Sequence, residues 1–357
     1  MSNPKVVRHY KYKNIAAALA VLLLIVVAIS TAGGSDKTAL KKDKNMSSSS
    51  AAESSTAETS SSEAEYSVGK LTGNYKYQTV KNGTTLGTGN LVLVDQNHKY
   101  AGEAEDLESV YSYLFNKSGD QIMSTSSTNL YATKECFEQF NKMISDFYIK
   151  TKLKTLMISD ALYMDGSSTA ETSAEESESQ ASENGCYEHE TGLAIDLRLY
   201  NSEDGTYPLF TGTEKYSWIP ENCWKYGFVL RYPEGKSDKT GVTALANHYR
   251  YVGKISAQIM NENNFVLEEY LEFIKDYTFE NPYSFRSQDG AGYAVYYVEA
   301  DKGTTTNIPI PLDESNGEYP YELSGNNVDG YILTVQILEG AKKTETSDDT
   351  SSVSEAE

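Results

Sequence analysis

Two histidines and an aspartate between Cys186 and Gly253 constrain this chain most, because a fold that uses them together must bring separate segments to one point. A turn at Gly192 followed by a strand would let His189 and Asp196 reach that point, and His248 would be the third ligand. A catalytic zinc usually takes three ligands from protein and one from water. We therefore predict one Zn²⁺ ion on these three residues. The alternative is two histidines with no metal role.

The charge of the chain is strongly negative and unevenly distributed. A formal net charge of −20 argues against a nucleic-acid partner, because binding to phosphates needs clustered Lys and Arg. Much of the acidity lies in Ser- and Glu-rich segments with too little apolar content to offset the entropy of ordering. We predict a disordered stalk at 33–66, a disordered insertion at 166–183 and a disordered acidic tail at 341–357.

An uncharged apolar segment at 14–32 follows a basic N-terminus at 1–13. Its length suits a membrane-spanning helix, so we predict a single-pass membrane anchor. The basic residues before it favour a cytoplasmic N-terminus and an extracellular C-terminal portion, although four lysines also follow it. A cleaved signal peptide is the alternative, because Ser30, Thr31 and Ala32 form a small-residue cleavage site.

Periodicity predicts an α+β domain over 67–279, with a small antiparallel sheet and flanking helices around the zinc site. Thr133 is the expected N-cap of a helix that carries Phe137, Phe140, Ile144 and Phe147 on one face. The other predicted helices are Ala104–Leu114, Glu221–Tyr226 ended by Gly227, one that follows Val252 and extends through Met260, and Leu267–Ile274. The predicted strands lie near Tyr75–Val80, Leu91–Val94, Leu153–Ile158 and Leu193–Leu199.

Beyond this domain the sequence changes character. Segments rich in Tyr, Val and Ile alternate with Gly and Asn turns from 280 to 340, which predicts a small C-terminal β module. Its tyrosines are consistent with glycan binding, but half-buried strand positions favour tyrosine anyway. The three cysteines, Cys136, Cys186 and Cys223, allow either one disulfide, such as Cys186 to Cys223, or three thiols.

The stretch around the metal ligands resembles the VanY-type D-alanyl-D-alanine carboxypeptidases. The match is carried by Glu188-His189-Glu190-Thr191-Gly192-Leu193-Ala194-Ile195-Asp196, by the block from Trp218 to Lys236, and by His248-Tyr249-Arg250-Tyr251-Val252-Gly253. The resemblance covers roughly residues 88 to 275. It implies a zinc peptidase that trims D-alanine from peptidoglycan stem peptides outside the cell. The residues expected to contact the substrate are Ser159, Tyr187, Trp218, Tyr226 and Arg231.

Three departures from the family pattern concern the expected active site. The family has a glutamate general base three residues before the last histidine, where this chain has Leu245. The family's substrate-binding arginine aligns with Leu162, and Tyr187 replaces a serine. Losing a general base costs about 10²- to 10⁴-fold in rate. Glu188, Glu190 and Glu234 are acids that could substitute for it.

The resemblance therefore leaves two functions open, besides a purely structural fold with an empty metal site. One is a membrane-anchored D,D- or L,D-carboxypeptidase with impaired activity. The other is a catalytically silent pseudoenzyme that keeps zinc and binds peptidoglycan.

Overall fold

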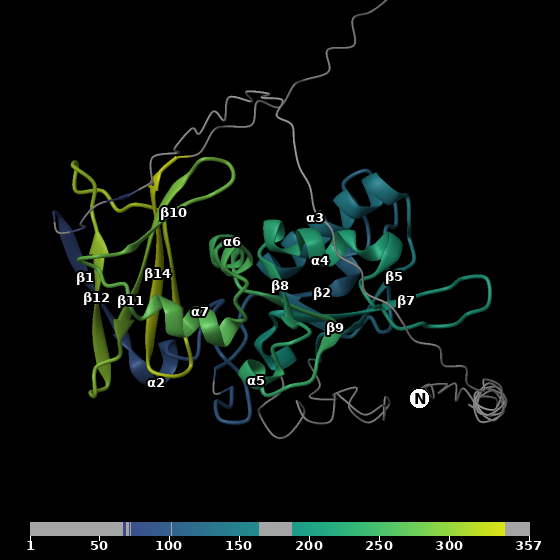
Figure 1. Cartoon of the computed structure of the whole chain (residues 1–357), viewed down its shortest axis with the longest axis horizontal. Helices are drawn as coiled ribbons and strands as arrows, with labels where there is room; N and C mark the ends of the chain where they lie inside the picture. The colour runs from purple at the N-terminus through teal and green to yellow at the C-terminus, as the bar shows by residue number, and fades with distance from the viewer. Residues whose placement is uncertain (1–66, 69–70, 72, 101, 164–187, 340–357) are drawn as a thin grey trace, which may run out of the picture. The chain divides into compact units, whose positions relative to one another are not determined.

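The computed structural model describes residues 67–68, 71, 73–100, 102–163 and 188–339 (Figure 1). They all belong to one compact unit, Glu63–Glu357. The predicted anchor, stalk, insertion and tail lie outside the described residues. None of the described helices is long and apolar enough to cross a membrane.

A five-stranded sheet carries the predicted metal ligands. Its strand order is β3 (Ser124–Thr125), β5 (Leu156–Asp160), β7 (Ala194–Leu199), β9 (Leu245–Tyr251) and β8 (Phe228–Tyr232). Only β3 runs parallel to its neighbour, and the other pairs are antiparallel. A smaller sheet beside it contains β2 (Leu107–Ser109), β4 (Leu130–Thr133) and β6 (Leu162–Tyr163). The predicted strands near Leu153–Ile158 and Leu193–Leu199 are thus confirmed as β5 and β7.

The long helix α3 (Lys134–Thr151) forms where the sequence predicts it. The Thr133 hydroxyl accepts a hydrogen bond from the Cys136 backbone N–H at 3.3 Å, which satisfies one of the free donors of the first turn. The predicted apolar face of the helix is fully buried against the five-stranded sheet and its neighbours; it comprises Phe137, Phe140, Ile144 and Phe147. α3 therefore supplies much of the core beneath the site.

The second helical segment of this core begins three residues before the predicted start at Glu221 and changes type along its length. It consists of α4 (Trp218–Asn222) followed by the 3₁₀ helix η6 (Cys223–Tyr226). Gly227 ends it in the left-handed conformation, as predicted, with φ 87°. Two further short helical turns are η5 (Glu214–Tyr216) and α5 (Ser237–Thr240). Cys136 and Cys223 are buried free thiols, whereas Cys186 lies outside the described residues.

Two predictions of local structure are wrong. The predicted helix Ala104–Leu114 is strand β2 followed by the 3₁₀ helix η1 (Val110–Tyr113), because Asp106 is left-handed at φ 51° and β2 pairs with β4. The predicted strand Leu91–Val94 is buried but joins no sheet. Its backbone instead bonds to Ser324 and Asn326 from later in the chain.

The predicted C-terminal β module is present and contains two sheets. One sheet has the order β10 (Tyr283–Arg286), β11 (Gly292–Glu299), β14 (Gly330–Leu338) and β13 (Tyr321–Gly325). The other pairs β12 (Thr305–Pro311) with β1 (Tyr75–Lys81), which stands at the start of the described chain and leads into α2 (Asn82–Thr85). Strand β1, predicted to belong to the zinc domain, thus pairs within the module.

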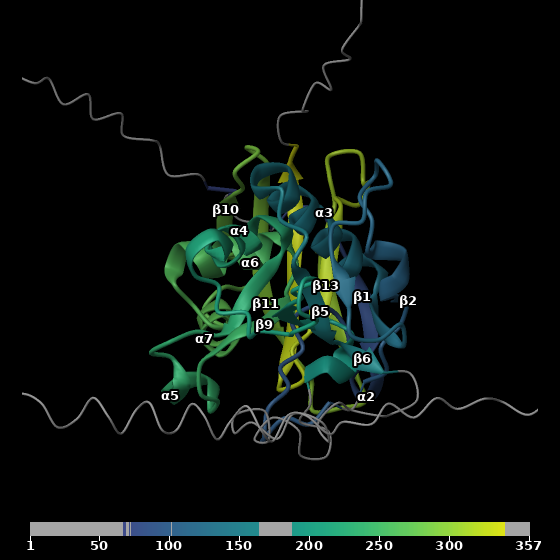
Figure 2. The ribbon, with the colours of Figure 1, turned by 90° about the vertical axis from the view of Figure 1, so that its right-hand side faces the viewer.

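Two helices connect the module to the five-stranded sheet. They are α6 (Lys254–Asn263) and α7 (Leu267–Ile274), both close to their predicted positions. Their apolar side chains form one cluster with residues of β11 and β14, including Val295 and Ile332. Figure 1 shows α6 and α7 between the two groups of strands, and Figure 2 shows the same elements from the side. A shared core therefore joins the module to the rest of the unit.

The Gly227→Ala substitution is expected to lower the free energy of unfolding by more than about 2 kcal/mol. A Cβ at this left-handed position would lie 2.5 Å from the Tyr251 ring, which is fully buried and held by a hydroxyl bond to Glu135. Gly235→Ala is the matched control, since Gly235 has φ 77° with nothing within 4 Å. Urea unfolding gives the loss of unfolding free energy in each variant, and the excess loss in Gly227→Ala over Gly235→Ala measures the clash. Equal losses of unfolding free energy would show that the Tyr251 ring moves aside at little cost.

Candidate metal centre

The three predicted ligands meet inside the protein. One ligand atom from each of His189, Asp196 and His248 lies within 4.8 Å of the other two, and all three residues are buried. His189 comes from the 3₁₀ helix η4 (Glu188–Thr191), Asp196 from β7 and His248 from β9. Within the described ranges this is the one group of His, Cys, Asp and Glu with metal-ligand spacing.

The strand register explains why the two strand ligands meet. Asp196 stands directly opposite His248 in the β7–β9 ladder, and directly opposite residues share a face with Cβ atoms about 4.5–5.5 Å apart. Gly192, at φ 67°, turns the chain between η4 and β7. The His189 ring lies within 3.1 Å of the Ala194 carbonyl through Nδ1. The turn therefore returns His189 to the start of the strand that carries Asp196.

The geometry of the cluster fits a cation. Asp196 Oδ1 lies 2.7 Å from His248 Nδ1 and 3.3 Å from His189 Nε2. Despite these short distances, Oδ1 is a buried acceptor with no hydrogen bond, so the three atoms are close without a donor aligned on the oxygen. A carboxylate oxygen and two imidazole nitrogens are the donor set of zinc sites. The residues present therefore suit a bound metal ion.

Outer contacts fix the orientation of both imidazoles. His189 Nδ1 faces the Ala194 carbonyl oxygen, and His248 Nε2 lies 2.8 Å from Glu188 Oε2. A metal-ligating histidine usually donates its second ring N–H to a carbonyl or a carboxylate. These partners leave His189 Nε2 and His248 Nδ1 on the side of Asp196. Sequence reasoning did not identify this role of Glu188.

Glu188 is the centre of a buried ion-pair network. Its Oε1 accepts hydrogen bonds from Arg231 Nε at 3.0 Å and from Arg250 Nη1 at 2.6 Å. Burial alone would raise the pKa of Glu188, but the two guanidinium groups outweigh burial and hold that pKa well below its usual range. Both carboxylate oxygens are therefore engaged, and Glu188 is unsuited to act as a proton acceptor in place of the missing general base.

Arg231 is predicted to contact the substrate, but its side chain is buried and paired within the protein. Its side chain is 1% exposed, and its Nη atoms bind Glu268 at 2.9 and 2.6 Å. Nε binds Glu188. In this structure all three nitrogens of the guanidinium group are committed to carboxylates of the protein itself.

Neighbouring charges set the pKa values of the two histidines and of Asp196. Burial opposes the charged form of His248, but Asp196 and Glu188 outweigh burial and raise the pKa of His248 to about 9. Burial also opposes protonation of His189, whose pKa is nonetheless raised by Asp196 and Asp160. Burial would raise the pKa of Asp196, yet the two imidazoles hold it below its usual range. A metal ion would displace protons from these imidazoles, because metal ligands bind in their deprotonated form.

Leu245 occupies the start of β9, where it is half-buried opposite Tyr232. The β8–β9 register shifts between this pair and the Leu230–Tyr249 pair. A leucine side chain has no lone pair and accepts no proton. Of the acids considered as substitutes, Glu188 is engaged as described, and Glu190 is exposed.

The structure adds one acid that sequence reasoning missed. Asp160, at the end of β5, is 7% exposed and stands opposite Asp196 in the β5–β7 ladder. Asp160, Asp196 and His248 thus form one row across three strands, and the Asp160 charge raises the pKa of His189. The available signal in the sequence is a carboxylate at the end of an apolar strand.

The other predicted substrate residues are scattered. Ser159 is half-buried at the β5 irregularity, and its carbonyl accepts a bond from the Ser126 hydroxyl at 2.7 Å. Trp218 and Tyr226 pack against each other with ring centroids 6.2 Å apart, beside the main core. Leu162 lies in β6, in the smaller sheet. Tyr187 lies outside the described residues.

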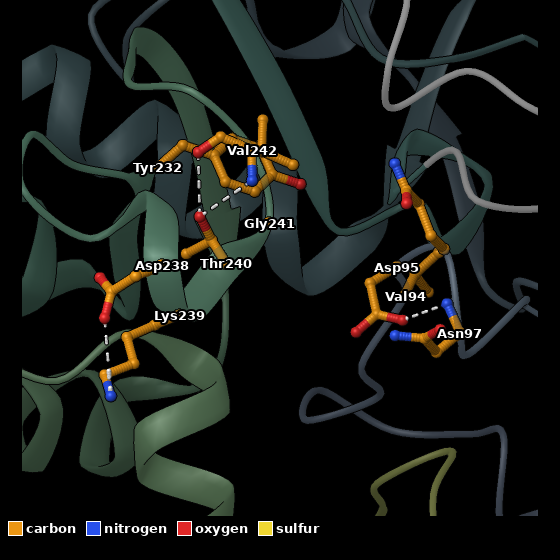
Figure 3. A pocket seen from close by; sticks show the side chains of 10 residues that line it. Val94, Asp95, Asn97, Tyr232, Asp238, Lys239, Thr240, Gly241 and Val242 are labelled. Atoms are coloured by element: carbon orange, nitrogen blue, oxygen red, sulfur yellow. Dashed lines mark hydrogen bonds and ion pairs between the residues drawn. The ribbon is translucent and has the colours of Figure 1, made fainter.

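A pocket of about 180 Å³ adjoins the cluster through Tyr232, whose ring centroid is 5.1 Å from that of His248. Figure 3 shows Asp238, Lys239 and Thr240 on one side of it and Val94, Asp95 and Asn97 on the other. The Thr240 hydroxyl bonds to the Val242 backbone. Lys239 is the basic residue of this lining. The pocket is thus small and polar, and an aromatic ring separates it from the metal cluster.

Comparison with known proteins agrees with this geometry. A family model described as VanY, D-alanyl-D-alanine carboxypeptidase, matches residues 130–254. A D-alanyl-D-alanine carboxypeptidase from Enterococcus faecium is 36% identical over 251 residues, which are 69% of this chain and 75% of that protein. The putative carboxypeptidase YodJ of Bacillus subtilis (strain 168) is 40% identical over 88 residues, 25% of this chain and 32% of that protein.

A solved structure shows a similar fold. It is the vancomycin-resistance D,D-dipeptidase VanXYg in complex with a D-Ala-D-Ala phosphinate analogue, which matches with a TM-score of 0.59 and 26% identity over 74% of this chain and 100% of that one. The α+β fold predicted from the sequence is confirmed. Together with the E. faecium relative, which this chain matches over three quarters of its length, these findings show that the chain belongs to the VanY family of D-alanyl-D-alanine carboxypeptidases.

Proposed function

We propose that this protein is a zinc-dependent carboxypeptidase that releases D-alanine from the D-alanyl-D-alanine ends of peptidoglycan stem peptides. The observation that carries the proposal is the buried Asp196 Oδ1, which has no hydrogen bond and lies beside two oriented imidazole nitrogens. The substrate class follows the names of the relatives, a D-alanyl-D-alanine carboxypeptidase and a dipeptidase in complex with a D-Ala-D-Ala analogue.

Each residue of the site would have its own role in such a reaction. His189, Asp196 and His248 would hold one Zn²⁺ ion, which when bound supplies Lewis-acid polarisation and an activated water. Glu188 orients His248 and is itself held by two arginines. Asp160, in the same cross-strand row as Asp196, is the described carboxylate best placed to accept a proton where Leu245 cannot.

We also propose that the protein works outside the cell and is held at the membrane by residues 14–32. The apolar, uncharged character of that segment supports this proposal, together with the basic residues that precede it. Peptidoglycan stem peptides lie on the same side of the membrane. Release of the protein from membranes by salt alone would contradict the anchor, and a mature N-terminus beginning after Ala32 would favour the cleaved signal instead.

A second candidate function is a zinc-containing, catalytically silent protein that binds peptidoglycan. Leu245 favours it, because the family's general-base position holds an aliphatic side chain. Leu162 favours it as well, since it lies in the smaller sheet where the family pattern has an arginine for the substrate carboxylate. This candidate predicts binding to purified peptidoglycan without release of D-alanine.

Release of D-alanine from a pentapeptide stem separates the two candidates. The first predicts release that a chelator stops and added Zn²⁺ restores, and that Asp160→Asn lowers by about 10²-fold or more if Asp160 takes the proton. Asp120→Asn is the matched control, because Asp120 is an exposed loop aspartate with only local bonds. No release at high protein concentration, with zinc bound, would leave the silent candidate standing.

Zinc is expected to bind in a ratio of one ion per chain and to raise the melting temperature. A ligand at 100 times its dissociation constant stabilises the folded state by about 2.7 kcal/mol. His189→Ala should abolish this shift, whereas His98→Ala should retain it, because His98 is a partly exposed histidine paired only with Asp95. Elemental analysis and thermal unfolding with and without Zn²⁺ measure both effects. An equal shift in the two variants would place the ion elsewhere.

A further inference from the structure

A second cavity lies away from the metal cluster, where α3, η6 and α6 face the β module. We call it the junction cleft. Its volume is about 830 Å³, within the range of sites that bind small molecules. Glu135 and Gln139 of α3, Tyr226 of η6, Lys254 of α6, Tyr293 of β11 and Glu322 of β13 line it. None of the three metal ligands belongs to its lining, so it is a separate space.

The composition of the lining limits what could bind there. It contains four tyrosines, four carboxylates and four glutamines but only two lysines. The excess of negative charge disfavours polyanions, and with Ile255 and Pro320 as the only non-aromatic apolar residues of the lining there is no surface for a lipid chain. Carboxylate and amide oxygens accept hydrogen bonds, and tyrosines offer apolar ring faces with a polar edge. The matching ligand carries many hydroxyl donors on a compact ring with apolar faces.

Some polar groups of the cleft have no partner within the protein. Gln139 is 7% exposed, and its Oε1 is a buried acceptor without a hydrogen bond. Glu322 and Lys254 are exposed and, in the described part of the chain, make no hydrogen bond or ion pair with the protein, whereas Glu135 accepts the Tyr251 hydroxyl at 2.6 Å. Leaving a buried acceptor unpaired costs about 1–3 kcal/mol, and such exceptions in a native fold call for an explanation. A ligand hydroxyl that donates to Gln139 provides one, and the exposed Glu322 and Lys254 are available to the same ligand.

We propose that the junction cleft is a carbohydrate-binding site for an oligosaccharide with N-acetyl groups. Sugar hydroxyls donate to Glu322 and to the Gln139 amide, and the acetamido carbonyl accepts from the Lys254 ammonium. The tyrosine rings cover the apolar faces of the sugar. This inference goes beyond the proposed peptidase function and does not depend on it, because the cleft shares no residue with the metal cluster.

The test is a calorimetric titration of the full chain, with the N-acetylglucosamine tetramer as the probe. We expect saturable binding of this probe and weaker binding of a glucose tetramer of the same length, which lacks the acetamido groups. A lysine-containing tripeptide is the third ligand, because an acidic cleft also attracts amines. Absence of tetramer binding, or binding of the tripeptide alone, would overturn the proposal.

Substitutions of residues that line the junction cleft test whether the tetramer binds there. Gln139→Leu and Lys254→Met should each lower the affinity for the tetramer by roughly 3- to 10-fold, the effect of one net hydrogen bond. Gln139→Leu also removes an unpaired buried acceptor, so its stability should be unchanged or higher. A loss of affinity without a loss of stability is not expected of a merely structural residue. Lys142→Met is the control, since Lys142 is an exposed lysine of α3 outside the lining.

His189→Ala separates the two sites. It should leave tetramer binding unchanged while it removes zinc. Parallel loss of both would show that the tetramer binds at the metal cluster, and unchanged affinity in both cleft variants would reject the cleft as its site.

Discussion

Replacing Leu245 with glutamate is expected to raise the rate of D-alanine release by about 10²- to 10⁴-fold, the contribution of a positioned general base. Leu245 is half-buried at the start of β9, three residues before His248, so a glutamate there could extend toward the cluster without displacing core side chains. The measurement is kcat/KM on a pentapeptide stem with Zn²⁺ present. A gain of this size would mean that the rest of the site is already assembled.

The control for this gain is Leu245→Gln, which has nearly the shape of glutamate but accepts no proton at neutral pH. It should leave the rate unchanged. If Leu245→Glu has no effect while Asp160→Asn removes the activity, the base is Asp160 and the protein has moved that function from β9 to β5. If both Leu245 variants are equally faster, shape rather than proton transfer explains the gain.

Glu188→Ala is expected to lower the free energy of unfolding by about 3–5 kcal/mol, the usual cost of removing one partner of a buried ion pair. Glu188 is 2% exposed and is the shared partner of Arg231, Arg250 and His248. Its removal leaves the buried Arg250 guanidinium with backbone carbonyls alone. Urea unfolding of the metal-free protein measures this loss apart from any change in zinc binding.

The neighbouring Glu190→Ala is the matched comparison. Glu190 belongs to the same 3₁₀ helix but is exposed, so its loss should change stability by no more than about 0.5 kcal/mol. Zinc affinity should fall by about 10- to 100-fold in Glu188→Ala, because an outer partner of a ligand is lost. Similar stability in the two variants would contradict the role assigned to the buried network.

Local signals in the sequence predicted much of the fold. The apolar face of α3 with its Thr133 cap, the turn at Gly227 and the exact span of α7 follow from spacing and turn chemistry that act over a few residues. The same spacing, strengthened by resemblance, identified three residues that the structure brings together. The helix expected at Ala104–Leu114 failed because pairing of β2 with β4, set by tertiary structure, outweighs local preference.

The remaining features depend on register and on long-range partners, which a single sequence does not encode in any short motif. Asp160 acquires its place only through the β5–β7 ladder, and its neighbour Ser159 marks an irregularity in that ladder. Arg231 is a predicted substrate contact, but its side chain binds two distant carboxylates: Glu188 precedes it by 43 residues and Glu268 follows it by 37. The resemblance identified the metal ligands but not the side chains that orient them.

The pairing of β1 with β12 has a consequence for the order in which the protein forms. The β module takes one strand from Tyr75–Lys81 and the others from residue 283 onward, so it is assembled from the two ends of the described chain. During synthesis the metal-binding sheet, completed at Tyr251, can form first, while β1 waits with unpaired backbone groups. An exposed strand edge is a template for aggregation. A chain that stops before β12 should therefore aggregate even with all three metal ligands present.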